Sequence, residues 1–256
     1  MNVAMMQPSF IPWPGYFELI LKSDVFVILD DFQFSYQSYH QRNRMFVNYG
    51  LANWYVVPIN KSISFKAPLN QVKINETTNW RIKMWKRMKT NYSKAAYYDF
   101  ISPWIETWLL EPTPDLSSQN FSFIEFVSGL LGYRGKFRFS SELPSDKIRS
   151  ERVIELLRWC EAKTYYCAKG SFDYMLEDNL FPVQDIKICF QDHQPTSYMQ
   201  IGSKNEFVPY LSVLDALMNI GPDKTKEIVL SGTEKWLFWD EMLSEVNRRG
   251  IDEKQS

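Results

Sequence analysis

The sequence is poor in cysteine and has no excess of either charge. Its three cysteines, Cys160, Cys167 and Cys189, form no Cys-x-x-Cys pair, and a chain of 256 residues needs no disulfide scaffold. The spacing of these cysteines, with His193 beside Asp192, predicts no zinc or other metal site, and we expect a reducing, cytoplasmic setting. With 29 basic and 30 acidic side chains, the sequence lacks the positive charge that binding to nucleic acid requires.

Long hydrophobic runs are also absent. Residues 1–13 have no basic region and contain two prolines, so we expect neither a signal peptide nor a membrane span. The 45% of hydrophobic residues and 23% of charged residues are typical of a globular protein with a buried core. Since no repeat or linker interrupts the pattern, we interpret residues 1–250 as one domain with a helical insertion at about 75–135, followed by a polar tail at 251–256.

The hydrophobic pattern predicts an α/β fold. Asn2 to Met6 and Asp24 to Leu29 are short apolar runs typical of buried strands, and a short helix with Pro14 in its first turn lies between them. A helix at Lys147 to Cys160, followed by a strand at Thr164 to Ala168, repeats the unit. Such crossovers join parallel strands, so we predict a mostly parallel Rossmann-like sheet flanked by helices, with ligands at its carboxyl edge.

Further elements follow from the same patterns. The tryptophans at 80, 85, 104 and 108 are spaced as parts of a helical core rather than as a ligand platform. The additional strands are predicted at 54–59, 71–74, 137–140 and 186–190, and the additional helices at 79–92, 97–110, 121–131 and 211–219.

The richest polar segment follows the second predicted strand. Asp30 and Asp31 stand at the end of that strand, where α/β folds often place acid, base or ligand-binding carboxylates, although one of them could instead cap a turn. His40 could exchange protons at cellular pH or be structural. These three are our candidate catalytic residues. Arg42 and Arg44 could each bind a carboxylate or phosphate, or one of them could pair with Asp30 or Asp31.

Two other regions could contribute to a binding site. Pro12 to Tyr16 predicts a stiff loop before a helix N-terminus, which suits a phosphate or carboxylate, or else a simple tight turn. Residues 169–174 follow the second candidate strand and could close the other side of one pocket. Ser212 and Asp215 have helical spacing and could be a cap and core residue or could contact a ligand. Cys167 has no base near it in the sequence, so a core position is favoured over a nucleophile.

The opening of the chain also carries the motifs of a known family. Gln-Pro at 7–8, Pro-Trp-x-Gly-Tyr-Phe at 12–17, Asp-x-x-Gln-Phe at 30–34 and Arg-Asn-Arg at 42–44 occur in order. With the segments 167–174 and 207–222, the chain resembles the WbqC-like protein family over about residues 1 to 222. On these motifs, we assign to substrate binding Gln7, Pro12, Trp13, Gly15, Tyr16, Gln33, Arg42, Asn43, Arg44, Lys169, Gly170, Asp173, Tyr174, Ser212 and Asp215.

The resemblance implies a role in O-antigen, lipopolysaccharide or other surface-polysaccharide biosynthesis. It implies an aminoacyl or acyl transferase, with glycyl as one possible group, that modifies an amino sugar or glycan precursor from a thioester or activated amino acid. A weaker resemblance to nucleotidyl transferases of the His-x-Gly-His type places Pro12 to Tyr16 at the motif, but both histidines are absent. The alternatives are therefore a nucleotide-dependent transferase or ligase and a non-catalytic module that binds a sugar nucleotide. No cofactor is assigned.

Overall fold

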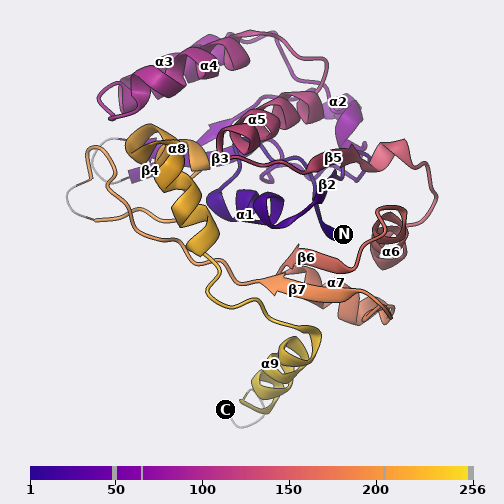
Figure 1. The fold of residues 1–256 in the computed structure, drawn as a ribbon. Coiled ribbons are helices and arrows are strands. Elements are labelled where there is room, and N and C mark those ends of the chain that lie inside the picture. The colour runs from indigo at the N-terminus through magenta and orange to yellow at the C-terminus, as the bar shows by residue number, and fades with distance from the viewer. Residues whose placement is uncertain (48–50, 65, 204–205, 253–256) are drawn as a thin grey trace.

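A five-stranded parallel sheet organises the molecule (Figure 1), in the order β5-β2-β1-β6-β7. Its strands are β1 (Asn2–Met6), β2 (Val25–Ile28), β5 (Lys136–Phe139), β6 (Thr164–Ala168) and β7 (Lys187–Gln191). The predicted Rossmann-like α/β fold is confirmed in this computed structural model, which describes residues 1–47, 51–64, 66–203 and 206–252. From β1, the strands β2 and β5 extend the sheet on one side, and the later strands β6 and β7 extend it on the other side.

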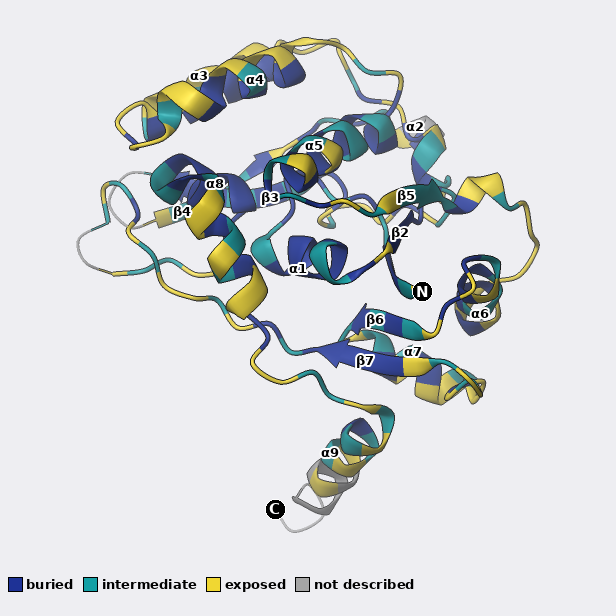
Figure 2. Ribbon diagram, in the orientation of Figure 1, coloured by how far each residue is buried: buried dark blue, intermediate teal, exposed yellow. Residues whose placement is uncertain are grey.

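Helices cover both faces of this sheet. Because successive strand residues point to opposite faces, Ala4, Phe26 and Ile28 pack on one side, while Val3 and Val27 pack on the other. The first side is covered by α1 (Pro14–Lys22), α5 (Leu116–Leu130) and α8 (Val213–Ser231), and the second by α6 (Arg149–Trp159) and α7 (Ser171–Asp178). The helix α1 is buried along much of its length (Figure 2), as expected for a crossover helix inside a three-layer fold.

An outer layer of helices lies over α5. It consists of α3 (Trp80–Tyr92) and α4 (Tyr98–Leu110), which expose their outer faces (Figure 2). Trp80, Trp85 and Trp108 are buried, and the ring of Trp104 stacks on Phe126 with centroids 3.6 Å apart. The prediction that these tryptophans form a core is confirmed.

A two-stranded antiparallel hairpin was not foreseen. It is formed by β3 (Arg42–Val47) and β4 (Leu51–Val56), and it contains the Arg-Asn-Arg motif. Polar side chains of this hairpin form hydrogen bonds with loops that are distant in sequence, and no local sequence pattern reveals such contacts. The strand predicted at 71–74 is wrong, because the chain there forms a 3-10 turn, η1 (Leu69–Gln71), and only a single bridge between Ile59 and Ile74. A short helix, α2 (Lys61–Ser64), precedes it.

Several helix boundaries also differ from the prediction. The helix α5 begins at Leu116 because the carboxylate of Asp115 caps it, accepting from the N–H of Ser118 at 2.8 Å. The helix α8 continues to Ser231 through a kink at Gly221, where the sequence predicted an end at residue 219. Neither α7 nor α9 (Trp239–Asp252) was predicted. The helix α9 reaches residue 252, within the predicted polar tail, and residues 253–256 lie outside the described part.

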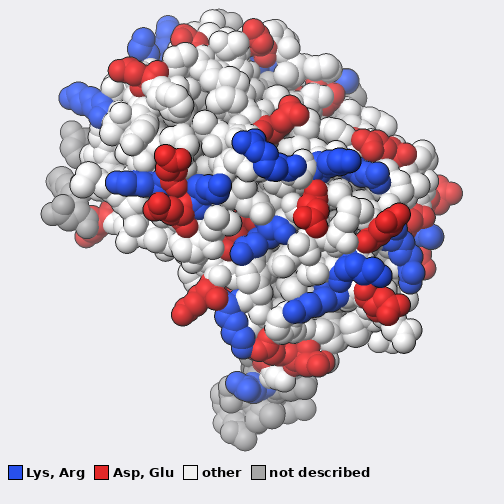
Figure 3. Space-filling view, viewed as in Figure 1, with Lys and Arg blue, Asp and Glu red and all other residues white. Residues whose placement is uncertain are grey.

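Charged side chains of both signs are intermixed on the face shown in Figure 3, in agreement with the net charge of −1. In the described part of the chain, none of the helices combines the length and the apolar character that crossing a membrane would need.

Candidate functional site

A cavity of about 420 Å³ lies beside the segment that follows β2. One wall comes from residues 33–36 and the other from Ile59, Lys61, Ser64 and Lys66. The two segments are joined beside the cavity by backbone bonds, from Phe34 N to Ala67 O at 2.9 Å and from Leu69 N to Phe32 O at 3.0 Å. The cavity is therefore a built feature of the chain at the carboxyl edge of β2, where α/β folds bind ligands.

The lining of this cavity combines positive charge with apolar surface. Lys61 and Lys66 contribute ammonium groups, and the Lys61 Nζ lies 4.8 Å from the ring centroid of Tyr36. Ser64 is buried, and its Oγ has no partner among the described residues, although buried hydroxyls are normally bonded. With the apolar Ile59, this lining suits an anionic ligand that also carries an apolar or flat part. Neither of these lysines nor Ser64 was predicted from the sequence as a site residue.

His40 supports the wall of the cavity from behind. Its Nε2 donates to Gln7 Oε1 at 3.2 Å, while Gln7 Nε2 donates to the carbonyl of Gln33 at 3.1 Å. Its Nδ1 accepts from the N–H of Ser35 at 3.4 Å. Burial lowers the pKa of His40 to about 4, so the imidazole is neutral at cellular pH. The structure thus brings Gln7, Gln33 and His40 together, with both ring nitrogens engaged.

Asp30 is held by hydrogen-bond donors from two other segments. Its carboxylate contacts Ser140 Oγ at 3.2 Å, the N–H and Oγ of Ser141 at 3.0 and 2.7 Å, and Asn70 Nδ2 at 3.2 Å. These bonds tie the end of β2 to the end of β5 and to η1. In this geometry Asp30 acts as a structural anchor that holds these elements together.

Asp31 is the more accessible of the two aspartates, with 28% of its side chain exposed. It contacts the hydroxyl of Ser140 and pairs with Arg152 of α6, whose Nη2 lies 3.1 Å from the carboxylate. In the described part of the chain, neither Arg42 nor Arg44 forms an ion pair with Asp30 or Asp31, so that predicted alternative is wrong. The Arg42 guanidinium instead stacks on Trp54, 4.3 Å from the ring centroid.

The hairpin β3-β4 fixes the loop between β1 and α1. Asn43 Nδ2 donates to the carbonyls of Phe10 and Ile11 at 3.3 and 2.8 Å. The carbonyl of Arg44 accepts a hydrogen bond from the N–H of Ser212 at 2.9 Å. The carbonyl of Pro12 accepts one from the N–H of Val213 at 2.8 Å. Asn43 therefore positions the loop through its side-chain amide, whereas Arg44 and Pro12 act through their backbone carbonyls.

Ser212 and Asp215 belong to the start of α8. The Ser212 Oγ accepts from Leu214 N at 3.2 Å as an N-cap. Asp215 is fully buried and accepts from the hydroxyls of Tyr92 and Tyr198 at 2.6 and 2.7 Å, while burial raises the pKa of its carboxyl. Both side chains thus hold the segment before α8 against the core.

Gly15 leaves room for a neighbouring side chain. A Cβ at this position would lie 2.2 Å from the Trp13 ring, so the indole covers the first turn of α1. Tyr16 is buried, and its hydroxyl donates to the carbonyl of Gln7 at 3.2 Å. The stiff loop was predicted to receive an anion at the helix N-terminus, and in the structure Trp13 occupies the space over Gly15.

Lys169, Gly170 and Asp173 line a different pocket of about 200 Å³, together with residues of α9. The Lys169 Nζ pairs with Asp192 at 3.0 Å and with Glu245 at 3.1 Å. The structure therefore does not bring these residues to the cavity beside Gln33. Tyr174 is largely enclosed, and burial raises its pKa.

Cys167 is buried in the core as predicted, and burial raises the pKa of its thiol well above the usual value. Across residues 1–47, 51–64, 66–203 and 206–252, no three His, Cys, Asp or Glu side chains gather as a metal ion would need.

Comparisons with known proteins agree with the motifs of the opening segment. The sequence model described as "WbqC-like protein family" matches residues 7–227. An uncharacterized protein of Mycobacterium tuberculosis, Rv1507c, is 29% identical over 224 residues, which cover 87% of this chain and 95% of that protein. No solved structure matches the chain significantly. The matched region begins directly after β1, contains the other four strands of the parallel sheet and both cavity walls, and ends within α8.

Proposed function

The chain belongs to the WbqC-like protein family, and on that premise we propose that it transfers an acyl or aminoacyl group, with glycyl preferred. The acceptor would be an amino sugar or glycan precursor of surface-polysaccharide biosynthesis. The observation that carries the proposal is the 420 Å³ cavity, which is lined by two lysines, by Phe34 and Tyr36, and by Ser64, whose buried hydroxyl has no partner in the described part of the chain. A sugar nucleotide or a phosphorylated acyl carrier offers the matching phosphate and apolar parts.

In this proposal the cavity binds and orients the ligand. Lys61 and Lys66 would attract the phosphate, with the Ser64 hydroxyl as a further donor. Tyr36 and Phe34 would pack on the sugar, base or acyl part. Holding donor and acceptor in reacting geometry would supply much of the rate.

The transfer also needs a group that accepts a proton from the attacking amine. The amine nitrogen attacks the acyl carbon, the bond from that carbon to sulfur or oxygen breaks, and the released proton passes through a base to the leaving group. Of the three residues proposed from sequence, Asp30 is occupied by four donors and His40 has both nitrogens engaged. Asp31, which is partly exposed, is therefore our proposed base within that set.

Two alternative functions can be distinguished from the transferase by experiment. The sheet order, with its switch beside β1, favours nucleotide binding, so a ligase that activates a carboxylate with ATP is the second candidate. Consumption of ATP distinguishes it. For a module that only binds a sugar nucleotide, Lys61→Met would weaken binding and no variant would change a turnover.

The experiment is a search for product by mass spectrometry. The purified protein is incubated with nucleotide amino sugars and either acyl thioesters or glycine with ATP. We expect an acylated sugar whose formation is strongly reduced in Lys61→Met, and its loss in Asp31→Asn would identify Asp31 as the base. The matched control is Glu106→Gln, an exposed carboxylate on α4. Absence of product with every donor, despite measurable binding of the sugar nucleotide, would reject the transferase.

A further inference from the structure

A second polar cluster lies between α1 and the end of β7. Glu18 is completely buried, and its carboxylate accepts four hydrogen bonds. The donors are Gln191 Nε2 at 2.7 Å, His193 Nδ1 at 2.8 Å, and the N–H and Oγ1 of Thr233 at 3.2 and 2.6 Å. Because this carboxylate acts as the acceptor, Nδ1 of His193 carries the proton. When the ring carries this single proton, its free electron pair lies on Nε2.

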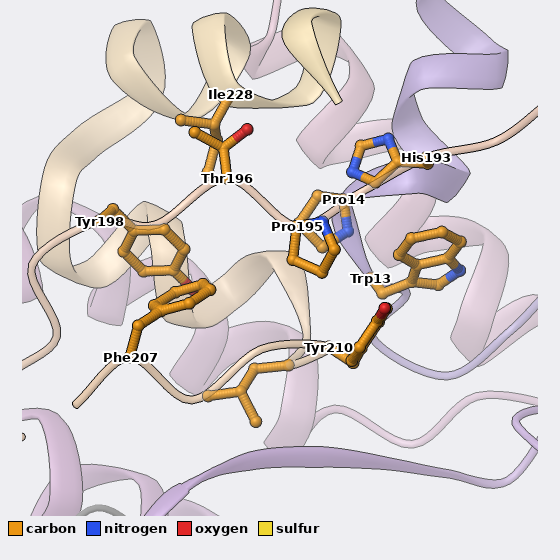
Figure 4. A pocket seen from close by; sticks show the side chains of 10 residues that line it. Trp13, Pro14, His193, Pro195, Thr196, Tyr198, Phe207, Tyr210 and Ile228 are labelled. Carbon is orange, nitrogen blue, oxygen red and sulfur yellow. The ribbon is translucent and has the colours of Figure 1, made fainter. Parts of the chain in front are cut away.

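The other edge of this imidazole belongs to a pocket. His193 lines a small pocket of about 20 Å³ that also includes Trp13, Pro195, Tyr198 and Tyr210. In Figure 4, the ring edge farthest from the backbone points toward the prolines of the pocket. No residue in the described part of the chain bonds to Nε2 of His193. A buried carboxylate that orients an imidazole whose second nitrogen is available is the arrangement of a general base.

The surroundings hold the ring in place. Trp13 contacts the His193 ring edge-on, with centroids 5.0 Å apart and planes at 87°. On another side, a Cβ at Gly232 would lie 1.9 Å from Cε1 and 2.4 Å from Nε2, so the ring rests on the glycine backbone. Tyr198, a wall of the pocket, is fixed by its bond to the buried Asp215. The polar pair and the pocket are thus built by residues of α1, of the segment that joins β7 to α8, and of α8 itself.

We propose that His193, oriented by Glu18, is the base that takes the proton of the attacking nucleophile, and that this pocket receives the end of a small acyl group. The inference rests on the proposed acyl transfer, and it assigns to His193 the role otherwise given to Asp31. A space of about 20 Å³ holds about one water-sized group, so it admits the methyl end of an acetyl group or the amino end of a glycyl group and excludes a fatty acyl chain.

The step balances without a further reactant. The nucleophile, an amine or water, forms a bond to the acyl carbon and gives its proton to Nε2 of His193. The bond between the acyl carbon and the leaving sulfur or oxygen breaks, and the proton then passes from Nε2 to the leaving group or to solvent. Glu18 is a positioning residue, because it contacts the imidazole and not the substrate.

The test uses p-nitrophenyl esters, which need neither the natural acceptor nor a cofactor. We expect the full-length protein to hydrolyse p-nitrophenyl acetate at least tenfold faster than the octanoate ester. His193→Gln should lower the acetate rate at least tenfold, and Glu18→Gln should lower kcat and shift the midpoint of its pH profile. Glu106→Gln is the matched control and should keep the wild-type rate. A rate unchanged in His193→Gln, or no higher than that of free imidazole, would overturn the inference.

A second measurement does not depend on activity or on how well a variant folds. The chain contains only two histidines, so nitrogen-15 labelling of histidine gives two assignable rings in the wild-type protein. We expect His193 to carry its proton on Nδ1 and His40 to carry it on Nε2. A proton on Nε2 of His193 would overturn the proposed pair.

The outcomes also separate this inference from the proposed function. Ester hydrolysis that is lost in His193→Gln, together with a failed search for acylated sugars, would keep the His193 base and reject the glycan substrate. An acylated sugar formed at the same rate by His193→Gln would keep the transferase and reject the His193 base.

Discussion

Two histidines of this chain occupy opposite hydrogen-bonding states. His40 is an Nε2 donor behind the wall of the larger cavity, whereas His193 is an Nδ1 donor to the buried Glu18. The sequence alone gave His40 priority because polar residues surround it. The structure shows that His193 is linked to a carboxylate 175 positions away, a distance that no local motif reveals. Assignments of single residues therefore depend on tertiary contacts more than on neighbours in the sequence.

The lowered pKa of His40 predicts a dependence of stability on pH. The pKa in the folded protein, about 4, lies below the unfolded value of about 6.5. The contribution of His40 to the free energy of unfolding is therefore complete above pH 6.5 and decreases as the pH falls toward 4. We expect the difference between wild type and His40→Gln to shrink by roughly 2 to 3 kcal/mol from pH 7.5 to pH 4.5. Urea unfolding at both pH values measures it, and parallel pH dependences would contradict it.

The two neighbouring aspartates should respond differently to the same change. Asp30→Asn places an amide among donors that need an acceptor, so we expect a loss of about 2 kcal/mol of unfolding free energy. Asp31→Asn should cost about 1 kcal/mol because that side chain is partly in water. Denaturant unfolding of both variants measures the difference, and equal losses would argue against Asp30 as the anchor.

At the scale of elements, the kink of α8 depends on a glycine. Gly221 has a φ of 79°, and a Cβ there would lie 2.4 Å from the ring of Tyr97. We expect Gly221→Ala to lower the unfolding free energy by about 2 kcal/mol or more. The matched control is Gly129→Ala in α5, where nothing lies within 4 Å of the added Cβ. That variant should be neutral or more stable by about 0.5 kcal/mol, and thermal unfolding compares the two.

The parallel sheet was predictable because strands buried on both faces appear as short apolar runs between helices. The hairpin β3-β4 was missed because its polar side chains meet partners elsewhere, as Asn43 does with the carbonyl of Ile11. The loop between β1 and α1 was predicted to bind an anion at the N-terminus of α1, and in the structure Gly15 accommodates the indole of Trp13 there. Lys61 and Ser64 could not be found from sequence, because only the pairing of distant segments makes them face one cavity.

At the scale of the whole molecule, one loop connects the two candidate centres. The segment from residue 7 to residue 13 begins with Gln7, which contacts the cavity wall through Gln33, and ends with Trp13 in the pocket of His193. Acidic and basic side chains are intermixed over the visible surface (Figure 3), so a general field would contribute little to ligand capture. Recognition of an anionic ligand should therefore depend on a few lysines at the cavity.

The most direct measurement of the central claim is calorimetric titration of a uridine diphosphate amino sugar into wild type, Lys61→Met and Lys83→Met. Lys83 is an exposed lysine of α3 and serves as the matched control. We predict that Lys61→Met raises Kd at least tenfold, because it removes one of the two ammonium groups at the cavity, and that Lys83→Met leaves Kd unchanged. Equal affinities for all three proteins, or no binding to wild type, would contradict the assignment of this cavity as the ligand site.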